Sequence, residues 1–276
     1  MNKFLSALFI SFLVACSPTG VKEKQQKEQK TSAKQFEIDG DYKIIEKKRL
    51  ENGLSFAWYK KGKGALLSDG DLIMIDYKVK LKDGSVVDGN HLLKRSEMPF
   101  LIGFNMQTKG WDLALKELCV GDFVRIIIPA ELARGEVGVK GLIPPNADNI
   151  IYLKILRKEK PVRIVDGCKV WLLEENKSNR LKFNESNKVN IHFMASTATN
   201  RMFINTFRTN EPFTFQFKDN SVVPGLKKAL INAKTSDRIF VLVPPTEAYG
   251  SKGFLDIVKP NESIFYNIMV MDVLKN

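Results

Sequence analysis

The chain carries one long segment twice, and this internal repeat constrains its fold more than any other feature. Residues 133–156 read ARGEVGVKGLIPPNADNIIYLKIL, and residues 248–270 read AYGSKGFLDIVKPNESIFYNIMV. Two further pairs keep the same separation: 109–122 (KGWDLALKELCVGD) with 224–237 (PGLKKALINAKTSD), and 123–135 (FVRIIIPAELARG) with 238–250 (RIFVLVPPTEAYG). Arg134 and Tyr249 are 115 positions apart, as are Trp111 and Leu226. A repeat of this length predicts two whole domains rather than small stacked units.

Periodicity indicates the same elements in each copy. GDLIMIDYKVKLKDGSVVDG (70–89) alternates apolar and polar residues and then turns at Asp83-Gly84, which predicts a strand and a hairpin; 186–205 has the same pattern. The segments 109–122 and 224–237 carry helical apolar stripes, formed by Trp111, Leu115 and Leu118 in the first copy and by Leu226, Leu230 and Ala233 in the second. We therefore expect an α+β fold in which each domain is a curved antiparallel β-sheet wrapped around one short α-helix.

The first forty residues predict an exported chain. Lys3 precedes the apolar run Phe4–Ala15, which is too short to span a bilayer comfortably. The run ends in Leu13-Val14-Ala15-Cys16, which resembles the lipobox of bacterial lipoproteins, where the cysteine thiol is acylated; the alternative is a plain secretory signal with an incidental cysteine. We expect a lipoprotein signal peptide at 1–15, a polar tether at 16–40, and domains at 41–160 and 161–276. Cys16 would then attach the protein to the membrane of the bacterial envelope, on the periplasmic side of the inner or outer membrane.

The composition of the chain argues against a nucleic-acid partner. The net charge of +12 is compatible with nucleic acid or anionic lipid as a partner, but the lysines are scattered among acidic residues and no nucleic-acid motif is present. We therefore expect an ordinary basic surface and no nucleic-acid partner.

Cys119 and Cys168 fall in different repeat units, and we expect both to be free, buried or half-buried thiols.

The first copy resembles FKBP-type peptidyl-prolyl cis-trans isomerases over the whole domain. The residues that carry the resemblance are YKVKLKDGSVVD, MPFLIG, KGWDLAL, the VGD turn and GLIPPNADNIIYLKIL within 70–159, with ENGLSFAWYKKGKG (51–64) as an N-terminal strand. The second copy is a more diverged version, through EPFTFQF, VVPGLKKAL, PPTEAYGSKG and KPNESIFY. A lipidated tandem protein of this kind is also similar to envelope isomerases associated with gliding motility, although no residue here selects that role.

The resemblance implies that the chain catalyses rotation about X–Pro bonds of polypeptide clients in an apolar pocket. Rotation about a peptide bond is opposed by a barrier of ~18–20 kcal/mol, and the twisted transition state is less dipolar than the planar amide, so a dry pocket favours it without metal or cofactor. The first copy aligns Tyr77, Asp88 and Trp111 with the catalytic positions. The implied substrate-binding residues are Val87, Phe100, Gln107, Thr108, Arg134, Leu142, Ile143 and Ile151.

Each copy departs from the family pattern. In the first copy Val87 replaces a phenylalanine, Gln107 and Thr108 replace aliphatic residues, and Arg134 replaces the loop tyrosine. In the second copy Phe193, Ile204 and Leu226 replace Tyr77, Asp88 and Trp111. The second-domain pocket would be formed by Phe203, Phe213, Val222, Val223, Leu226, Tyr249, Ile257 and Tyr266.

Simpler interpretations remain for several of these residues. Phe100, Leu142, Ile151 and Trp111 are of types that commonly serve only as core, and Asp88 could cap a turn. His91 and His192 have no partners at metal-ligand spacing, so we expect no metal site. The interpretation we favour is a folding isomerase whose first domain is active and whose second is weak or inactive. The alternative is a non-catalytic FKBP-like binding module or chaperone.

Overall fold

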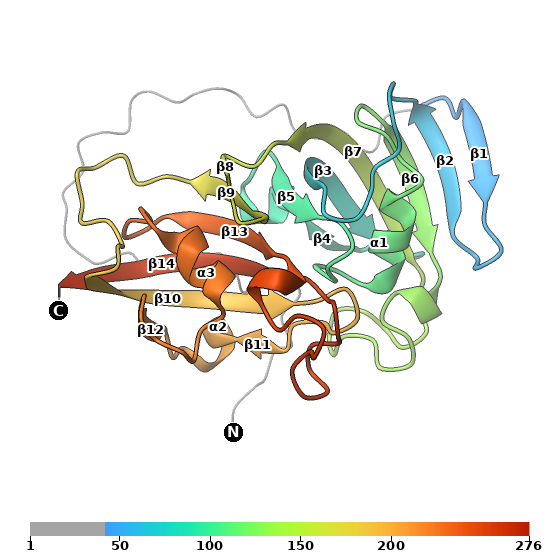
Figure 1. The fold of residues 1–276 in the computed structure, drawn as a ribbon. Helices are drawn as coiled ribbons and strands as arrows, with labels where there is room; N and C mark the ends of the chain where they lie inside the picture. The colour runs from blue at the N-terminus through green and yellow to red at the C-terminus, as the bar shows by residue number, and fades with distance from the viewer. Residues whose placement is uncertain (1–41, 276) are drawn as a thin grey trace. The chain divides into compact units, whose positions relative to one another are not determined.

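The computed structural model describes residues 42–275, which form two seven-stranded sheets (Figure 1). The predicted signal peptide, the tether and Cys16 lie outside the described residues. The two sheets are antiparallel and carry few helices, so the predicted α+β class is confirmed.

The first sheet has the strand order β1-β2-β6-β7-β3-β4, with β5 paired to β3. Its strands are β1 (Glu46–Arg49), β2 (Ser55–Lys60), β3 (Leu72–Lys80), β4 (Val86–Gly89), β5 (Met98–Leu101), β6 (Phe123–Ile128) and β7 (Asn149–Glu159). The helical segments of this part of the chain are η2 (Asn90–Leu93), α1 (Lys109–Leu115) and η3 (Ala130–Leu132).

The second sheet repeats this order strand for strand as β8-β9-β13-β14-β10-β11, with β12 paired to β10. Its strands are β8 (Arg163–Val165), β9 (Cys168–Glu174), β10 (Asn187–Ser196), β11 (Ile204–Asn205), β12 (Phe213–Gln216), β13 (Arg238–Val243) and β14 (Ile264–Lys275). The helices are α2 (Thr206–Thr209), α3 (Pro224–Leu230) and η4 (Pro245–Glu247). The internal repeat therefore describes two copies of one topology.

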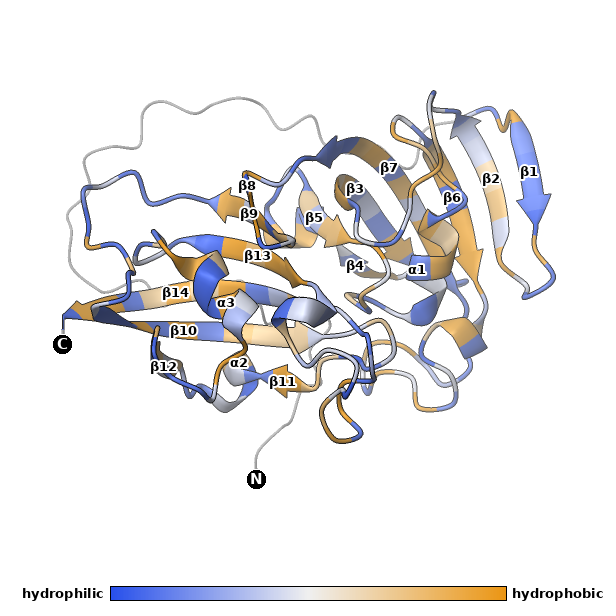
Figure 2. Cartoon of the chain, in the orientation of Figure 1, coloured by the Kyte–Doolittle hydropathy of each residue, from blue (hydrophilic) through white to orange (hydrophobic). Residues whose placement is uncertain are grey.

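Alternation of side chains sets the two faces of the strands. In β7 the side chains of Ile151, Leu153 and Ile155 are fully buried, and those of Tyr152 and Lys154 between them are half-buried. Figure 2 shows the corresponding bands of hydrophobic and hydrophilic residues along β3 and β7. In contrast, β1 is hydrophilic and exposed throughout, which is why no apolar pattern marked it in the sequence.

Both main helices are shorter than their sequence stripes indicated. Helix α1 ends at Leu115 and α3 ends at Leu230, so Leu118 and Ala233 lie beyond the helices, although both are buried. After α3 the chain turns at Asn232, whose φ of 71° lies in the left-handed region that asparagine tolerates. The second domain also has the four-residue helix α2, so the prediction of one helix per domain is incomplete there. The Asn205 side chain caps α2 by accepting a hydrogen bond from the backbone N–H of Arg208.

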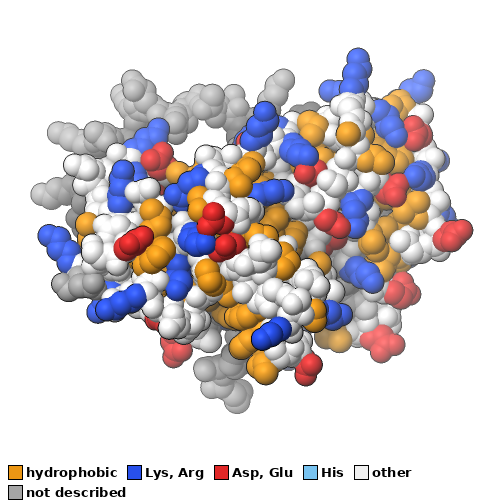
Figure 3. Space-filling model, in the orientation of Figure 1, with side chains coloured by type: hydrophobic (Ala, Val, Ile, Leu, Met, Phe, Trp, Pro, Cys, Tyr) orange, Lys and Arg blue, Asp and Glu red, His pale blue; other side chains and the backbone are white. Residues whose placement is uncertain are grey.

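The described residues show a mixed surface charge (Figure 3) and no helix that could span a membrane. On the face seen in Figure 3, basic and acidic side chains are interspersed. Between residues 42 and 275, no helix is both long and apolar enough to cross a bilayer.

Candidate functional site

Two of the predicted catalytic residues form one buried pair. Strands β3 and β4 are hydrogen-bonded neighbours, and Val79 faces Asp88 in their register. The Tyr77 hydroxyl donates to Asp88 Oδ1 at 3.1 Å, and both side chains are almost fully buried. Burial raises the pKa of Tyr77 well above its usual value, and the adjacent Asp88 carboxylate raises it further. Tyr77 therefore stays a neutral hydroxyl over the physiological range.

Asp88 does not cap the hairpin turn. That role belongs to Asp83, whose carboxylate accepts from the backbone N–H of Ser85 at 2.9 Å and from its hydroxyl at 2.6 Å. Asp88 instead accepts from Tyr77 and from the backbone N–H of Gly89. The turn-cap interpretation of Asp88 is therefore wrong, and its place in a pocket stays a prediction.

The indole of Trp111 is stacked on a second aromatic ring. Trp111 is the third residue of α1, and its ring lies 5.6 Å from that of Phe100, centroid to centroid, at an interplanar angle of 17°. Both side chains are buried. Stacking and burial make the two rings one apolar unit of the interior.

The residues just before α1 are polar and nevertheless buried. Gln107 and Thr108 are only 5% and 4% exposed. Thr108 is the N-cap residue of α1, yet its side chain makes no capping hydrogen bond, and its Oγ1 is buried without a hydrogen-bond partner among the described residues. An unpaired buried hydroxyl is unfavourable, so this atom lowers the stability of the free protein.

The long loop has the same backbone in both domains. The N–H of Gly138 donates to Arg134 O, and the N–H of Asn146 donates to Gly135 O; the hydrogen bonds of Gly253 to Tyr249 O and Asn261 to Gly250 O repeat them. Arg134 and Tyr249 therefore occupy equivalent positions, as the repeat predicted.

Glycine is required where the loop closes. A Cβ added to Gly138 would lie 2.4 Å from the carbonyl oxygen of Ile143, and one added to Gly253 would lie 2.4 Å from that of Val258. Both glycines also have positive φ, 58° and 68°. In the first loop Ile143 is buried, whereas Leu142 and Arg134 are half-buried.

The remaining predicted residues of the first copy are part of its buried interior. Ile151 on β7 is paired with Ile126 on β6 and is fully buried. Val87 on β4 is 2% exposed. The place of these two residues in a pocket stays a prediction.

The residues predicted for the second pocket belong to one apolar cluster. The buried members are Val222, Val223, Leu226 and Tyr266, and the partly buried members that pack against the cluster are Phe203, Phe213, Tyr249 and Ile257. Phe193 contacts the rings of Phe213 and Tyr266 at centroid distances of 6.1 and 5.9 Å. Burial raises the pKa values of both tyrosines, and that of Tyr266 is raised further by Tyr249.

The second domain has lost the polar pair as a unit. Ile204 faces Ala195 in the β10–β11 register, as Asp88 faces Val79 in the first sheet. Phe193, in the position of Tyr77, has no hydroxyl, and Ile204 has no carboxylate. The Ile204 side chain is 40% exposed, whereas that of Asp88 is 2% exposed. Ile204 thus takes the place of Asp88 in the strand but not its buried position.

Sequence reasoning missed the polar groups that fix these strands. The amide oxygen of Asn90 accepts from the backbone N–H of Tyr77 at 2.8 Å, and the hydroxyl of Thr206 accepts from that of Phe193 at the same distance. The signal was available, because Asn90 and Thr206 stand at equivalent places after the hairpin strand.

Two buried aspartates at equivalent positions are structural. Asp122 accepts hydrogen bonds from the indole N–H of Trp58 and from the backbone N–H groups of Gly62 and Cys119. Asp237 accepts from the backbone N–H groups of Asn176 and Lys234 in the same way. Both carboxylates are satisfied by local backbone and are not exposed to a substrate.

The histidines and cysteines show no catalytic arrangement. His192 is hydrogen-bonded to Thr206 and stacked on Phe207, and burial lowers the pKa values of both His192 and His91. Cys119 and Cys168 are free thiols, as predicted. Within residues 42–275, no group of His, Cys, Asp and Glu side chains is placed to hold a metal ion.

These features define a class of protein: tandem antiparallel sheets with short helices, stacked buried aromatics, a buried tyrosine–aspartate pair and a conformationally fixed Gly-rich loop. The family model for FKBP-type peptidyl-prolyl cis-trans isomerases matches residues 64–156 and 180–271. The chain therefore belongs to the FKBP-type peptidyl-prolyl cis-trans isomerase family, and it contains two copies of the domain.

Individual relatives are similar at a moderate level. Human peptidyl-prolyl cis-trans isomerase FKBP10 is 25% identical over 207 residues, which is 75% of this chain and 35% of the human protein. The isomerase FkpA of Buchnera aphidicola is 34% identical over 133 residues, 46% of this chain and 51% of that protein. The crystal structure of the three FKBP domains of wheat FKBP73 covers 82% of this chain and 97% of that chain, with 24% identity and a TM-score of 0.41. The chain spans about a third of the length of the human relative.

Proposed function

We propose that the first domain is a peptidyl-prolyl cis-trans isomerase, and that the Trp111–Phe100 stack and the Tyr77–Asp88 pair are the side chains that act on its substrate. The observation that supports this most directly is that all four side chains are at most 3% exposed, although two are polar. The prolyl ring would contact the indole. A buried hydroxyl and a buried carboxylate would orient the flanking peptide groups.

The chemistry requires only binding and exclusion of water. The twisted amide in the transition state has lost its resonance and part of its dipole, so its free energy is lowered relative to the planar amide when water is excluded. X–Pro bonds are suitable substrates because both isomers are populated and exchange takes tens to hundreds of seconds without a catalyst. The clients are expected to be proline-containing polypeptides.

In this proposal the second domain binds polypeptide and catalyses weakly or not at all. Leu226 offers less surface than an indole, and the pair of polar side chains is replaced by Phe193 and Ile204. The Phe193–Phe213–Tyr266 cluster nevertheless retains an aromatic surface. The rival interpretation, in which neither domain catalyses and both hold a client, is favoured by Arg134 in the first loop.

Substitution of Trp111 tests the proposal in the full chain. Trp111→Leu removes apolar contact worth about 1.5–3 kcal/mol, so isomerisation of a prolyl peptide should slow roughly tenfold or more. Trp171→Leu is the matched control, because Trp171 is equally buried and lies in β9, outside the predicted pocket residues. Thermal melting of both variants separates loss of activity from unfolding.

The outcomes are distinct. Loss of activity in Trp111→Leu alone supports an active first domain. Loss in a Leu226→Ala variant, with Trp111→Leu unchanged, would place activity in the second domain. A wild-type chain that does not accelerate isomerisation but suppresses aggregation of an unfolded client would favour the binding-module alternative.

We further propose that the protein is a lipoprotein of the bacterial envelope, anchored through Cys16. The support is sequence alone: the apolar run Phe4–Ala15 followed by Cys16. Cys16→Ser should abolish incorporation of a palmitate analogue and release the protein from membranes washed at high salt, which removes proteins held by charge alone. Salt-resistant membrane fractionation of an unlabelled Cys16→Ser variant would contradict the anchor.

A further inference from the structure

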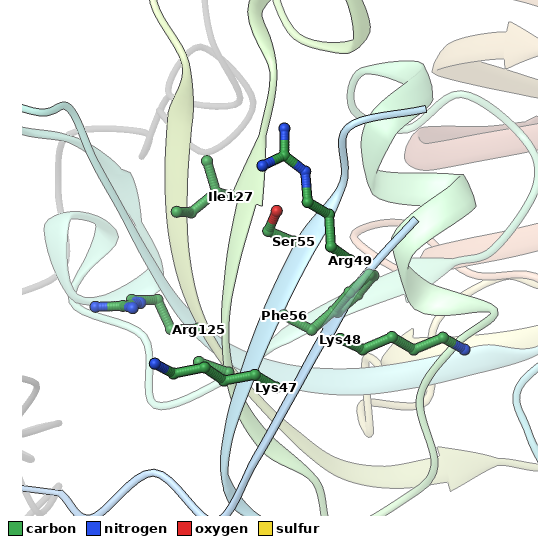
Figure 4. Close-up of a pocket in the computed structure, with 8 residues that line it drawn as sticks. Lys47, Lys48, Arg49, Ser55, Phe56, Arg125 and Ile127 are labelled. Carbon is green, nitrogen blue, oxygen red and sulfur yellow. The ribbon is translucent and has the colours of Figure 1, made fainter. Parts of the chain in front are cut away.

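The outer face of the β1–β2–β6 corner carries a basic hollow that the isomerase function does not use. Cross-strand register places Lys47, Ala57 and Arg125 in one row, and Arg49, Ser55 and Ile127 in the next. The middle strand contributes two small side chains to these rows, Ala57 and Ser55, and Phe56 and Lys48 also line the hollow. These rows enclose an open hollow of about 310 Å³ (Figure 4).

The cations of this face have no carboxylate among the described residues. The three cations that share the face are Lys47, Arg49 and Arg125, and none of them makes an ion pair within residues 42–275. Lys48 lies on the opposite face of β1, where it is paired with Glu117 at 2.6 Å. Figure 4 shows Lys47 and Arg125 reaching to the same side and Lys48 reaching to the other. Like charges held in adjacent rows favour an anionic partner.

The charged groups do not converge on one point. In Figure 4 the Arg49 guanidinium extends away from the Lys47 ammonium and the Arg125 guanidinium instead of closing over the hollow. A single small oxyanion would need donors that meet around it. This arrangement fits an extended anionic surface better than a small ligand.

The adjoining part of the same face is aromatic and apolar. Tyr59 and Phe123 are 4.9 Å apart, and Tyr42 contacts both rings at 5.6 and 4.9 Å. By strand alternation Ile45 shares this face with Lys47, and its side chain is 55% exposed. Lys154 lies over the Phe123 ring at 5.1 Å. Exposed tyrosine and aliphatic side chains beside lysine and arginine are typical of surfaces that rest at the level of lipid headgroups.

The chain outside the described residues joins this face. Tyr42 is the first described residue, so residues 1–41, including Cys16, connect to the molecule at the aromatic part of the face. Glu46 on β1 is an acidic neighbour of this region, and it is paired with Lys61 at 3.0 Å.

We propose that the outer face formed by Tyr42, Ile45, Lys47, Arg49, Tyr59 and Arg125 docks the first domain on a bilayer surface rich in anionic lipids. Acidic polypeptides and nucleic acid are the competing partners. Both are flexible polyanions, and neither requires the exposed aromatic and aliphatic part of this face. This docking does not depend on isomerase activity.

The test uses the chain from Ser17 onward, which keeps every described residue and lacks both the apolar run Phe4–Ala15 and the acylation site. Its binding to vesicles of phosphatidylcholine with and without phosphatidylglycerol is measured by co-sedimentation. We compare the triple variant Lys47→Gln/Arg49→Gln/Arg125→Gln with a control of equal charge change on exposed residues elsewhere, Lys177→Gln/Arg180→Gln/Lys275→Gln.

The expected result is binding to the anionic vesicles alone, weakened by added salt. Each cation near an anionic surface contributes about fivefold, so the triple variant should bind about a hundredfold more weakly than the parent and the control only slightly so. Equal loss in the control, or unchanged binding of the triple variant, would overturn the proposal. So would a parent chain that ignores vesicles but binds a polyglutamate peptide or an RNA oligonucleotide through these three cations. Isomerase rates of both variants should equal that of the parent.

Discussion

Thr108→Val should stabilise the first domain. The Thr108 side chain is 4% exposed, makes no cap bond to α1, and has an unpartnered buried Oγ1. Valine has the same shape without the hydroxyl, and the desolvation penalty of an unsatisfied hydroxyl is about 1–3 kcal/mol. The free energy of unfolding should rise by about that amount. A Thr→Val change at a functioning N-cap would instead be destabilising by about 0.5–2 kcal/mol.

The second domain supplies the reciprocal experiment. Val223 is the N-cap residue of α3, at the position equivalent to Thr108, and is 8% exposed. Val223→Thr should therefore lower stability by about 1–3 kcal/mol if the site offers no partner. Urea unfolding of the full chain, followed by tryptophan fluorescence and by circular dichroism, gives both changes, because Trp58 and Trp111 report on the first domain and Trp171 on the second.

The same variant tests the availability of the hydroxyl to substrate. If Thr108 donates to a carbonyl of the bound peptide, Thr108→Val should lower kcat/KM by roughly two- to tenfold, equivalent to ~0.5–1.5 kcal/mol for one hydrogen bond. A variant with unchanged or reduced stability would refute the reasoning, because it would mean that Oγ1 already has a partner such as a bound water.

Three further predictions concern the loop and a thiol. Arg134→Tyr should raise the isomerase rate on neutral X–Pro peptides several-fold, because a neutral hydroxyl can form a hydrogen bond worth ~0.5–1.5 kcal/mol without burying a charge. A lower rate on peptides with acidic flanks would show that the arginine binds those flanks. No change on either peptide would mean that position 134 points away from the substrate. Gly138→Ala should destabilise the chain by about 1–3 kcal/mol, since its Cβ would meet the Ile143 carbonyl oxygen. Gly135→Ala is the control: its φ is 55°, but the space around its Cβ is open, so it should be less destabilising. Equal effects of the two substitutions in urea unfolding would contradict the steric argument. Burial, with Glu247 nearby, raises the pKa of the Cys168 thiol from 9.0 to about 11. The folded state therefore holds its proton more tightly, and about 2–3 kcal/mol of stability should be lost as the pH rises from 9 to 11; Cys168→Ala should show a smaller loss over this window, and an identical loss would argue against the shift.

The repeat and its apolar periodicities were enough to predict the fold class and the paired domains. Strand β1 could not be predicted, because its four residues are charged and exposed, and only pairing with β2 makes it a strand. The helix ends were also misjudged. An apolar stripe continues through Leu118 and Ala233 because both residues remain buried after the helix has ended, and burial alone does not distinguish a helix from the turn that follows it.

The candidate site was predicted in part. All four residues of the Tyr77–Asp88 and Phe100–Trp111 pairs were identified, but the contact within each pair was not. Those contacts depend on strand register and ring orientation, which the local sequence does not encode. The exposure of Ile204 was not foreseen, since its alignment with Asp88 specifies a register position and not the direction of a side chain at the end of a two-residue strand. Asn90 was missed because an amide that binds backbone has the same appearance in sequence as a loop residue.

The Tyr77–Asp88 hydrogen bond makes these two positions depend on each other during evolution. Replacing Asp88 alone would leave a buried hydroxyl without its carboxylate, and replacing Tyr77 alone would take a donor from a buried carboxylate. Any path between the two domain sequences by single substitutions therefore crosses a less stable intermediate. Restoring the pair in the second domain has a related obstacle: Phe193→Tyr alone would add a buried hydroxyl with no partner, whereas Ile204 is 40% exposed, so Ile204→Asp would leave its carboxylate in contact with water. A lineage can reach the second substitution only if the rest of the chain is stable enough to tolerate the first. One domain can therefore diverge in this way only in a protein whose other contacts give more stability than folding requires.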